Sequence, residues 1–411
     1  MIQSADIVVI GAGVIGLSTA YELARRSTCS VVVVDKGTGL GEGSTGASSS
    51  VCRFRYTRNE MVELARDGIN AYQNWGHYLE TNNPQAIYQR QGNVWLGAEQ
   101  DTYAGEVERL SEIGVECCYL DDDQLTERFP AFSPCMMPPD LETGEERGFK
   151  AGGRHLLEEE GGYMEPVDVL TDLADACRRR GVEILLSESV IAARPSGSGF
   201  KVDLASGLKM GCGTLVNAAG PWAERVNALM NLETRWAFQA TRIQIVQVDR
   251  PTAAEGQIPI CADPAGGIYF RTQSQGQKIV IGSLLPSDEQ ERVSDADNFD
   301  RSADDIFVAQ KLHALAHRLP SFNYEGQINH YSGLYTVNTL DMHPVVGSTP
   351  ITNYFIANGF SGHGFKIAPA IGQLLAKQIT GISAPGDTNT NPSFLSWHRE
   401  PINLSDMSVC A

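Results

Sequence analysis

The first residues of the chain alternate between short apolar runs and glycine-rich breaks. Residues 7–10 are apolar, residues 14–26 carry small and apolar side chains at helical spacing, and residues 30–35 form a second β-branched run. Buried parallel strands are continuous apolar runs, and a crossover helix joins them. This order predicts a β-α-β unit, from which α/β folds are built.

Further along, the pattern switches between helical spacing and strict alternation. Residues 60–80 predict a helix with Leu64, Ile69, Tyr72 and Trp75 facing inward, and alternation from 240 to 284 predicts an antiparallel sheet. Further strands are expected at 92–97, 182–186, 200–204, 214–218 and 354–357, and further helices at 102–113, 166–180, 306–318 and 368–380. Residues 288–305 are acidic and predict a solvated loop, and the last thirty residues predict an extended tail.

Composition and charge exclude several classes of protein. The 411 residues are 42% hydrophobic and 20% charged, as in ordinary globular proteins of two domains. The formal charge of −18 disfavours nucleic acid and anionic membranes as partners. We expect no signal peptide, no membrane span and a cytoplasmic location. The nine cysteines include no CxxC pair, so we expect reduced thiols and no metal site.

The turn after the first strand carries a dinucleotide fingerprint, Gly11-Ala-Gly13-Val-Ile-Gly16. Gly11 permits the tight turn, Gly13 lets the backbone approach a pyrophosphate, and Gly16 lets helix and strand pack closely. The helix then presents free N–H groups to the phosphates. Asp35, at the end of the second strand, is placed to accept hydrogen bonds from ribose hydroxyls. The motif predicts a bound dinucleotide and does not by itself separate NAD from FAD.

Two later segments narrow the choice of cofactor. Residues 215–222 (Leu-Val-Asn-Ala-Ala-Gly-Pro-Trp) form a strand that runs into small residues, and residues 341–347 read Asp-Met-His-Pro-Val-Val-Gly. Together with Glu165-Pro166, they resemble the D-amino-acid oxidase family of flavoproteins, and these motifs stand along the chain in the order found in that family. The resemblance covers nearly the whole chain and implies FAD as the cofactor. It also implies an α/β fold: a Rossmann-like FAD-binding domain of the glutathione-reductase type with an α+β substrate domain built on an antiparallel sheet.

The segments assigned to the two domains interleave along the chain. We expect the FAD-binding domain to comprise residues 1–85, 150–228 and 325–390. The substrate domain is expected to comprise residues 86–149 and 229–324, followed by a C-terminal tail at 391–411.

One run of residues is especially specific within the family. Residues 358–366 (Asn-Gly-Phe-Ser-Gly-His-Gly-Phe-Lys) resemble a segment of sarcosine oxidases and dimethylglycine dehydrogenases. In that branch the run crosses the flavin, and its lysine, here Lys366, helps to bind the substrate carboxylate. A helix expected to begin near Ile367 would add its positive end to this lysine, which favours the anionic edge of reduced flavin.

The loop after Asp35 supplies a second cation. Residues 43–56 resemble the branch's loop beside the isoalloxazine ring, in which Arg53 falls at the carboxylate-binding arginine and Tyr56 also matches. An arginine fork grips a carboxylate with two parallel hydrogen bonds. We favour Arg53, with Arg55 and Arg58 as alternatives.

Other polar residues are candidates for the substrate side. Tyr269 and Arg271 share one face of a predicted strand, where either a substrate role or a structural pair is expected. Tyr335 is predicted to reach the same cavity, and His363 to be a flavin neighbour rather than a base. The resemblance assigns cofactor contacts to Gly11, Gly13, Val14, Ile15, Gly16, Asp35, Lys36, Ser44, Thr45, Ser48, Ser49, Val190, Ala218, Ala219, Gly220, Trp222, Gly333, Gly359, Ser361, Gly362, His363, Gly364, Phe365 and Lys366.

The sequence departs from the branch at three positions. The cysteine that links the flavin in many sarcosine oxidases is missing near Gly333, and loop 43–52 lacks the attaching histidine of dimethylglycine dehydrogenases. We therefore expect noncovalent FAD, with Cys52 as an alternative attachment point. The oxygen-activating lysine of monomeric sarcosine oxidases aligns near Val280, with Lys278 two residues away. The electron acceptor is thus expected to be either oxygen or an electron-transfer protein.

These features predict an FAD-dependent enzyme that oxidises the C–N bond of a small N-alkylated or cyclic amino acid. A hydride would pass to flavin N5, and the imine product would hydrolyse. The alternatives are a D-amino-acid or 2-hydroxy-acid dehydrogenase, a flavoprotein subunit of a larger assembly, and a tailoring oxidase for a bulkier substrate whose pocket mouth residues 134–160 would reshape.

Overall fold

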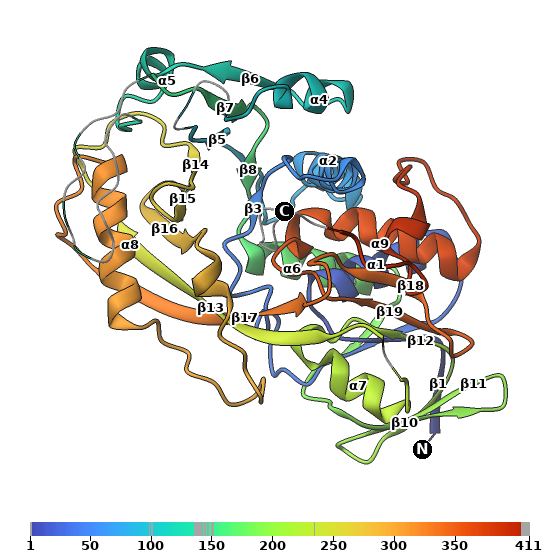
Figure 1. Ribbon diagram of the computed structural model, residues 1–411. Coiled ribbons are helices and arrows are strands. Elements are labelled where there is room, and N and C mark those ends of the chain that lie inside the picture. The colour runs from blue at the N-terminus through green and yellow to red at the C-terminus, as the bar shows by residue number, and fades with distance from the viewer. Residues whose placement is uncertain are drawn as a thin grey trace.

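A computed structural model describes residues 2–97, 99, 102–134, 143, 145, 148, 152–233 and 235–403 of the chain. Two eight-stranded sheets dominate the fold. The first sheet and its helices form the right-hand part of Figure 1, and the second sheet forms the left-hand part. The predicted α/β architecture with an antiparallel second sheet is confirmed.

The first sheet has a parallel centre with antiparallel additions. The parallel strands are β1 (Ile2–Ile10), β2 (Val31–Val34), β9 (Glu183–Leu185), β12 (Lys209–Asn217) and β19 (Tyr354–Asn358). The antiparallel strands are β10 (Val190–Ser196), β11 (Gly199–Leu204) and β18 (Val345–Ser348). The order is β10-β11-β12-β1-β2-β9, with β19 also paired to β12.

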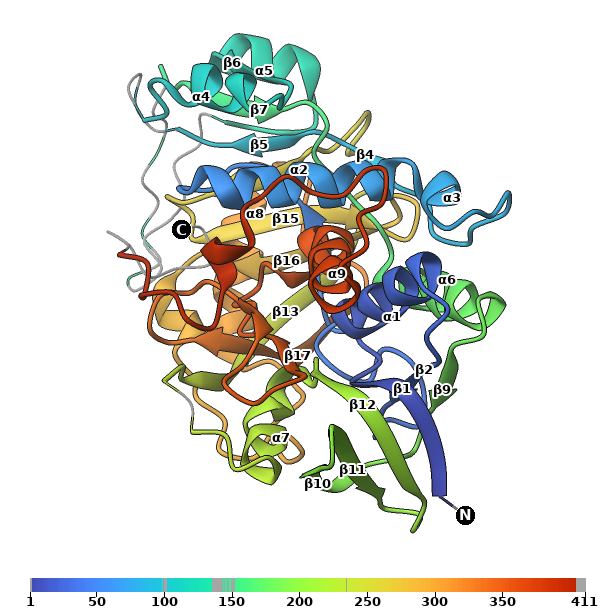
Figure 2. The same cartoon turned by 90° about the vertical axis from the view of Figure 1, so that its right-hand side faces the viewer.

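Both faces of this sheet are covered, which explains the continuous apolar runs in its strands. Ile7 and Val9 belong to the cluster shared with the helices α1 (Val14–Arg26), α2 (Asn59–Gln73), α6 (Pro166–Arg179) and α9 (Gly364–Thr380). Val8 and Ile10 point to the opposite cluster, which includes residues of α7 (Ala223–Leu229). Figure 2 shows α1 and α9 side by side, with α2 beyond α9.

The second sheet carries a core of its own. Its order is β17 (Ile328–Asn338), β13 (Phe238–Asp249), β16 (Lys278–Ser283), β15 (Ile268–Gln273), β14 (Ile260–Asp263), β5 (Asn93–Trp95), β7 (His155–Glu158) and β6 (Cys117–Leu120). All neighbours are antiparallel except β14 and β5. The helix α8 (Asp305–Arg318) packs against its apolar face.

Short elements complete the described chain. A small sheet joins β3 (Val51–Cys52) and β4 (Gln89–Arg90) to β8 (Gly162–Tyr163), so that β3 leads directly into Arg53. The short helices are α3 (Trp75–Tyr78), α4 (Glu106–Glu112) and α5 (Asp122–Arg128), with single 3-10 turns η1 (Gly220–Trp222), η2 (Pro286–Glu289) and η3 (Pro392–Leu395).

Two predicted helices and the predicted C-terminal tail differ from the structure. The helix predicted at 60–80 breaks at Asn74 into α2 and α3, although its four predicted inward residues are buried. The helix expected to begin near Ile367 begins at Gly364. The tail is not merely extended, because Leu395 and Trp397 are buried in the body of the protein. Residues 404–411 lie outside the described residues.

The two sheets also differ from the expected segment boundaries at two strands. Both β7 and β17 belong to the second sheet, whereas segments 150–228 and 325–390 were assigned to the first domain. Most of the first half of the 134–160 insertion lies outside the described residues. Within the described part of the chain, no helix has the length and apolar character needed to cross a membrane.

Candidate functional site

The glycine turn after β1 is closed against two neighbouring backbones. Gly11 has a φ of 109°, and a Cβ there would lie 2.4 Å from the carbonyl oxygen of Ala218. A Cβ on Gly16 would lie 1.9 Å from the carbonyl oxygen of Gly11. Side chains at these positions would collide with backbone, so the turn requires glycine. This geometry brings the start of α1 next to the small residues that follow β12.

Polar groups from the following loop complete this turn. The Val14 N–H donates to Thr45 Oγ1 over 3.2 Å. Asp35 accepts from the Ala12 N–H at 2.6 Å and from the Gly37 N–H at 2.7 Å. The carboxylate predicted to hold a ribose therefore also fixes the backbone of the turn, and its contact with ribose stays a prediction.

The residues present fit the phosphates of a dinucleotide. The N-cap residue of α1 is Gly13, which has no side chain to cap the helix, and Thr45 accepts from the Val14 N–H instead, so the positive end of α1 lies at the turn. The hydroxyl Oγ of Ser44, next to Thr45, is buried and has no hydrogen-bond partner in the described structure. A buried hydroxyl without a partner is costly, and a phosphate oxygen would satisfy it. The turn, Ser44 and Thr45 thus form a suitable cradle for FAD.

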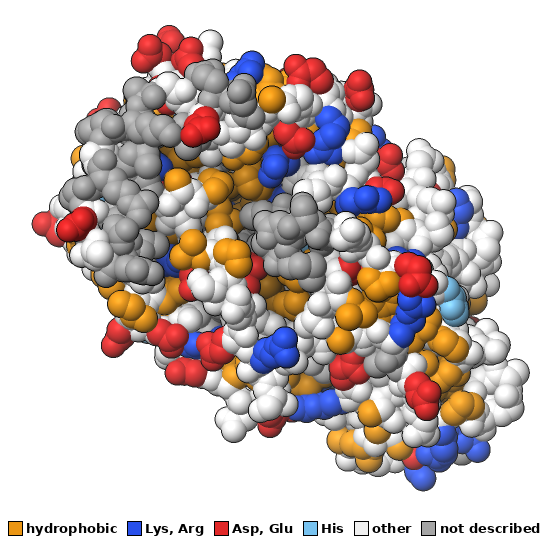
Figure 3. Space-filling view, viewed as in Figure 1, with side chains coloured by type: hydrophobic (Ala, Val, Ile, Leu, Met, Phe, Trp, Pro, Cys, Tyr) orange, Lys and Arg blue, Asp and Glu red, His pale blue; other side chains and the backbone are white. Residues whose placement is uncertain are grey.

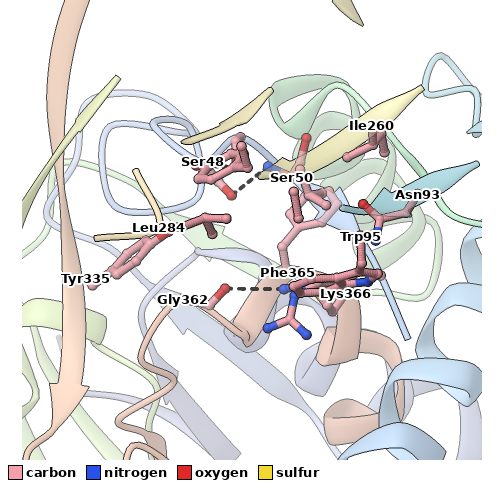
Figure 4. Close-up of a pocket in the computed structure, with 15 residues that line it drawn as sticks. Ser48, Ser50, Asn93, Trp95, Ile260, Leu284, Tyr335, Gly362, Phe365 and Lys366 are labelled. Atoms are coloured by element: carbon pink, nitrogen blue, oxygen red, sulfur yellow. Dashed lines mark hydrogen bonds between the residues drawn. The ribbon is translucent and has the colours of Figure 1, made fainter. Parts of the chain in front are cut away.

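A small cavity lies where loop 48–53, the second sheet and the start of α9 meet (Figure 4). Its volume is about 60 Å³. Its walls are formed by Ser48, Ser49, Ser50, Val51, Arg53, Asn93, Trp95, Ile260, Ala262, Tyr269, Leu284, Tyr335, Gly362, Phe365 and Lys366. Figure 3 shows hydrophobic side chains gathered in a central recess of one face, with acidic and basic side chains interspersed around it.

Of the three candidate arginines, only Arg53 is among the residues that line this cavity. Its guanidinium carbon lies 4.1 Å from the centre of the Tyr56 ring and 5.3 Å from that of Trp95. Arg55 instead pairs with Glu106 at 3.0 Å, and Arg58 lies near Glu60 at 3.8 Å. The geometry therefore favours Arg53 over its two alternatives for a role in the cavity.

Lys366 lines the same cavity from the first turn of α9. Pro369 lacks the N–H that would bond the Phe365 carbonyl, and the Tyr72 hydroxyl donates to that carbonyl over 2.7 Å instead. Helix α2 approaches closely at Gly68, where a Cβ would lie 2.2 Å from the Lys366 carbonyl oxygen. The Lys366 ammonium donates to the Gly362 carbonyl at 3.4 Å (Figure 4). Lys366 thus comes from a firmly packed helix end.

Tyr269 and Arg271 both contact the loop that precedes Arg53. The Tyr269 hydroxyl donates to Ser49 Oγ at 3.0 Å, and burial raises the pKa of Tyr269 to about 12. Arg271 is fully buried and donates to the Ser49 carbonyl and to Ser50 Oγ. Both side chains therefore hold the loop, and Tyr269 also lines the cavity.

The loop before α9 is pinned to the end of β17. The Ser361 N–H donates to the Thr336 carbonyl at 2.9 Å, and Ser361 Oγ accepts from the Asn338 N–H at 3.0 Å. Gly359 and Gly362 have φ values of 73° and 86°. A Cβ on Gly333 of β17 would lie 2.5 Å from the Cβ of Ala47. The predicted cofactor segments around Gly333, Gly359 and Ser48 are thus brought together.

His363 is buried beside these segments. Its ring meets the Tyr56 ring edge-on, with centres 5.2 Å apart, and its Nδ1 has no hydrogen-bond partner in the described structure. Burial, together with the charges of Lys366 and Arg53, lowers the pKa of His363 well below its usual value. The imidazole is therefore neutral at neutral pH, and its unsatisfied nitrogen suits contact with a bound group.

Three predicted cofactor residues pack against parts of the fold outside the cavity lining. Val190, on β10, packs against the apolar cluster on the α7 side of the first sheet. Lys36 lies over the Trp222 ring, with its ammonium 4.0 Å from the ring centre. Both Lys36 and Trp222 contact Asp297, which lies in the acidic segment expected to be a solvated loop. Asp297 is exposed in a turn of this segment, as expected of a solvated loop, and it also pairs with Arg225 at 2.5 Å.

Asp297 therefore connects the loop after η2 to two predicted cofactor contacts. Burial alone would raise the pKa of its carboxyl, but the bonds from Lys36, Arg225 and Trp222 outweigh this and lower the pKa to about 2. We expect Asp297→Asn to release FAD about two- to fivefold faster, because exposed ion pairs contribute little each. Stopped-flow flavin fluorescence would measure the rate.

Asp295→Asn is the matched control for this substitution. Asp295 pairs with Arg225 at 2.5 Å and accepts from the Asp297 N–H at 3.0 Å, a bond that an asparagine oxygen can keep, and within the described chain it does not contact Lys36 or Trp222. The control should leave FAD release unchanged. Equal release from both variants would show that Lys36 and Trp222 do not help to retain the cofactor.

Two side chains were candidates for reaction with the flavin or with oxygen. One is held in an unreactive protonated form, and the other is paired outside the cavity. Cys52 is fully buried, and burial raises the pKa of its thiol to about 12. Lys278 begins β16 and pairs with Asp249 at 2.8 Å. Neither a reactive thiolate at Cys52 nor an ammonium at Lys278 is presented to the cavity.

Sequence reasoning missed three residues that shape the cavity. Asn93 and Trp95 come from β5 and line its wall, and Glu158 of β7 lies behind them. No motif marks any of the three, and Glu158 sits in a run of three glutamates that is typical of a solvated surface. The pairing of β5 with β7, which the sequence does not specify, brings them together.

Comparison with known proteins identifies the family. A family model described as FAD dependent oxidoreductase (DAO) matches residues 6–378. FAD-dependent oxidoreductase domain-containing protein 1 of Bos taurus is 27% identical over 98% of this chain and 84% of its own length. Peroxisomal sarcosine oxidase of Mus musculus is 26% identical over 90% of each chain.

The fold is shared with solved flavoenzyme structures. L-proline dehydrogenase from P. horikoshii superposes with a TM-score of 0.81 at 20% identity, covering 97% of this chain and 98% of that one. The resemblance seen in Glu165-Pro166 and in segments 215–222, 341–347 and 358–366 is therefore confirmed. The chain belongs to the DAO family of FAD-dependent oxidoreductases.

Proposed function

We propose that this enzyme oxidises the C–N bond of a small amino acid that is N-alkylated or cyclic, using noncovalently bound FAD. One observation carries the proposal: two cations, Arg53 and Lys366, line the same small cavity, and most of its remaining wall is apolar or aromatic. Such a cavity suits one carboxylate attached to a compact, uncharged remainder.

The side chains of the cavity have separate roles in this proposal. Arg53 and Lys366 hold the carboxylate and so orient the carbon that carries the nitrogen. Trp95, Leu284 and Phe365 surround the remainder and exclude water. FAD, when bound, would accept one hydride, that is, one proton and two electrons, from that carbon. The glycine turn, Ser44 and Thr45 would hold its phosphates, and loop 47–50 with residues 359–363 would hold its ring.

The charge of the cavity also bears on the form of the amine. Among the described residues that line it, none is acidic. An ammonium group would find no partner of opposite charge there, and burying it would be costly. The amine is therefore expected to react in its neutral form, whose lone pair assists departure of the hydride. The chain then needs no general base for this step.

The names of two similar proteins agree with this substrate class. Sarcosine, the substrate named for the Mus musculus relative, is an N-methylated amino acid. Proline, named for the P. horikoshii structure, is a cyclic one. Both molecules carry one carboxylate beside a secondary amine, which is the combination that Arg53, Lys366 and the apolar wall would accept.

The proposal is tested by anaerobic titration of the purified yellow holoenzyme. Sarcosine, dimethylglycine, proline, pipecolate, D-amino acids and 2-hydroxy acids would be offered in turn, with flavin bleaching followed by absorbance. We expect bleaching by amino acids whose nitrogen is N-alkylated or part of a ring. Bleaching by 2-hydroxy acids alone would overturn the proposal.

The same sample reports on the acceptor and on the attachment of the cofactor. Reoxidation by oxygen, or only by a dye, distinguishes an oxidase from a dehydrogenase that uses an electron-transfer protein. Since Cys52 is buried as a thiol, acid precipitation should leave the flavin in the supernatant. Flavin that stays with the pellet would indicate covalent attachment.

A further inference from the structure

A buried carboxylate lies directly behind the arginine loop. Glu158 ends β7, and its side chain is 0% exposed. Its Oε2 accepts from the Phe54 N–H at 3.0 Å and from Asn93 Nδ2 at 3.1 Å. Its Oε1 accepts from the Arg55 N–H at 2.6 Å and from Trp95 Nε1 at 3.2 Å. Each oxygen therefore receives two donors.

These four bonds restrain both the backbone and the surroundings of Arg53. The Phe54 and Arg55 N–H groups belong to the two peptides that follow Arg53, so the loop cannot shift without breaking them. Trp95, held through its indole N–H, lies under the Arg53 guanidinium at 5.3 Å. The Arg53 guanidinium also donates to the carbonyl of Arg55, whose N–H is held by Glu158, so a shift of this loop would move the guanidinium as well. A two-point grip on a carboxylate requires one fixed placement of the guanidinium.

Glu158 also balances the charge of the cavity. Arg53 and Lys366 contribute two positive charges at its wall, and an ionised Glu158 behind it contributes one negative charge. Burial raises the pKa of the Glu158 carboxyl, whereas the Phe54 and Arg55 N–H groups and the charge of Arg53 oppose this rise. On balance the pKa of Glu158 is raised, so its negative charge behind the two cations depends on these donors.

We propose that Glu158 is a positioning residue of the substrate site, which orients Arg53 toward the cavity and thereby sets the affinity for a carboxylate. The inference rests on the proposed function, in which Arg53 grips that carboxylate. It adds a residue that does not itself line the cavity among those described.

Glutamine at position 158 probes this role without changing the side-chain volume. A carboxylate only accepts hydrogen bonds, whereas an amide has one accepting oxygen and one donating NH₂ group. Whichever oxygen the NH₂ replaces, it would face two N–H donors. Two of the four bonds are then lost, and the loop or the wall must move.

The test is a titration of the holoenzyme with acetate, in which binding is measured from the change in flavin absorbance. Acetamide is the uncharged comparison probe. We expect Glu158→Gln to weaken acetate about tenfold or more and to change acetamide less than about twofold. Glu159→Gln is the matched control, because Glu159 pairs with Arg128 at the surface at 2.6 Å. It should leave both probes unchanged.

A double-mutant cycle with Arg53→Gln separates positioning from general damage. In the Arg53→Gln background, Glu158→Gln should weaken acetate no further, because its effect passes through Arg53. Three results would each overturn the inference. Glu158→Gln could weaken acetate as much in the Arg53→Gln background as in the parent, it could weaken acetamide as much as acetate, or it could tighten acetate binding. Tighter binding would mean that Glu158 acts only as a nearby negative charge.

Two further results keep the inference separate from the proposed function. If Arg53→Gln itself leaves the acetate affinity unchanged, Arg53 does not bind the carboxylate. The proposed function and the inference about Glu158 are then both wrong. If Arg53→Gln weakens acetate and Glu158→Gln does not, only the inference about Glu158 falls. Should Glu158→Gln fail to fold with flavin, Trp95→Phe removes one donor to Glu158 and keeps an aromatic ring at the cavity wall, so it is expected to weaken acetate about threefold and to leave acetamide unchanged. No change in that variant would also overturn it.

Discussion

Arg53→Gln is expected to lower kcat/KM for a carboxylate substrate roughly 30- to 1,000-fold, a loss of about 2–4 kcal/mol in transition-state stabilisation. Arg53 is nearly buried at the cavity wall, where its guanidinium would grip the substrate carboxylate through two charge-assisted hydrogen bonds. Glutamine keeps a single donor group and no charge. Steady-state kinetics with the substrate identified by the bleaching titration would measure the loss.

The structure offers a closely matched control on the same loop. Arg58 is exposed and lies near Glu60 at 3.8 Å, outside the cavity lining. Arg58→Gln removes the same charge from the chain and should leave kcat/KM within about twofold, since such surface pairs contribute little. Equal losses in both variants would mean that net charge, rather than a grip by Arg53, controls the reaction. Lys366→Met should resemble Arg53→Gln.

The cofactor cradle could be predicted because its determinants are local in sequence. The turn from Gly11 to Gly16 needs glycine because the chain bends tightly, its backbone is closely approached and a helix begins there, and these requirements can be recognised within a few residues of sequence. The structure adds the partner that this turn presses against, the carbonyl of Ala218, which lies some two hundred residues later. That partner was predicted only through the resemblance of segment 215–222.

The arginine of the site shows where local reasoning needs support from the fold. Arg53, Arg55 and Arg58 are chemically equivalent in the sequence. In the fold they take different positions. Arg53 directly follows β3 and lines the cavity, whereas Arg55 pairs with Glu106. The choice between them depends on long-range packing, which periodicity alone does not encode.

The run Glu158-Glu159-Glu160 shows what could not be predicted. Three like charges in sequence are typical of a solvated surface. In the structure Glu159 pairs with Arg128 and Glu160 lies near Arg90, as that pattern indicates. Glu158 instead turns inward, because its strand pairs with β5 and four donors from two separate segments meet there. Asp297 similarly finds its partners Lys36 and Trp222 across the fold.

Gly16→Ala is expected to abolish FAD retention and to destabilise the fold by about 3 kcal/mol or more. Helix propensity alone argues for the opposite sign, since alanine is favoured over glycine in a helix by about 1 kcal/mol. The Cβ, however, would lie 1.9 Å from the Gly11 carbonyl oxygen. Backbone cannot rotate away as a side chain can, so the start of α1 must move off the turn, and overpacking of this kind costs roughly 1–3 kcal/mol even where side chains adjust.

Gly211→Ala separates this clash from a general intolerance of alanine. Gly211 lies in β12 of the same sheet, its φ is not among the positive values, and a Cβ there meets nothing within 4 Å. That variant should retain FAD and unfold within about 0.5 kcal/mol of the parent, as substitutions in open positions do. Thermal unfolding of both variants, with and without added FAD, gives the comparison. A Gly16→Ala protein that keeps its flavin and its melting temperature would show that α1 can leave Gly11 without cost, and the cradle would then need another description.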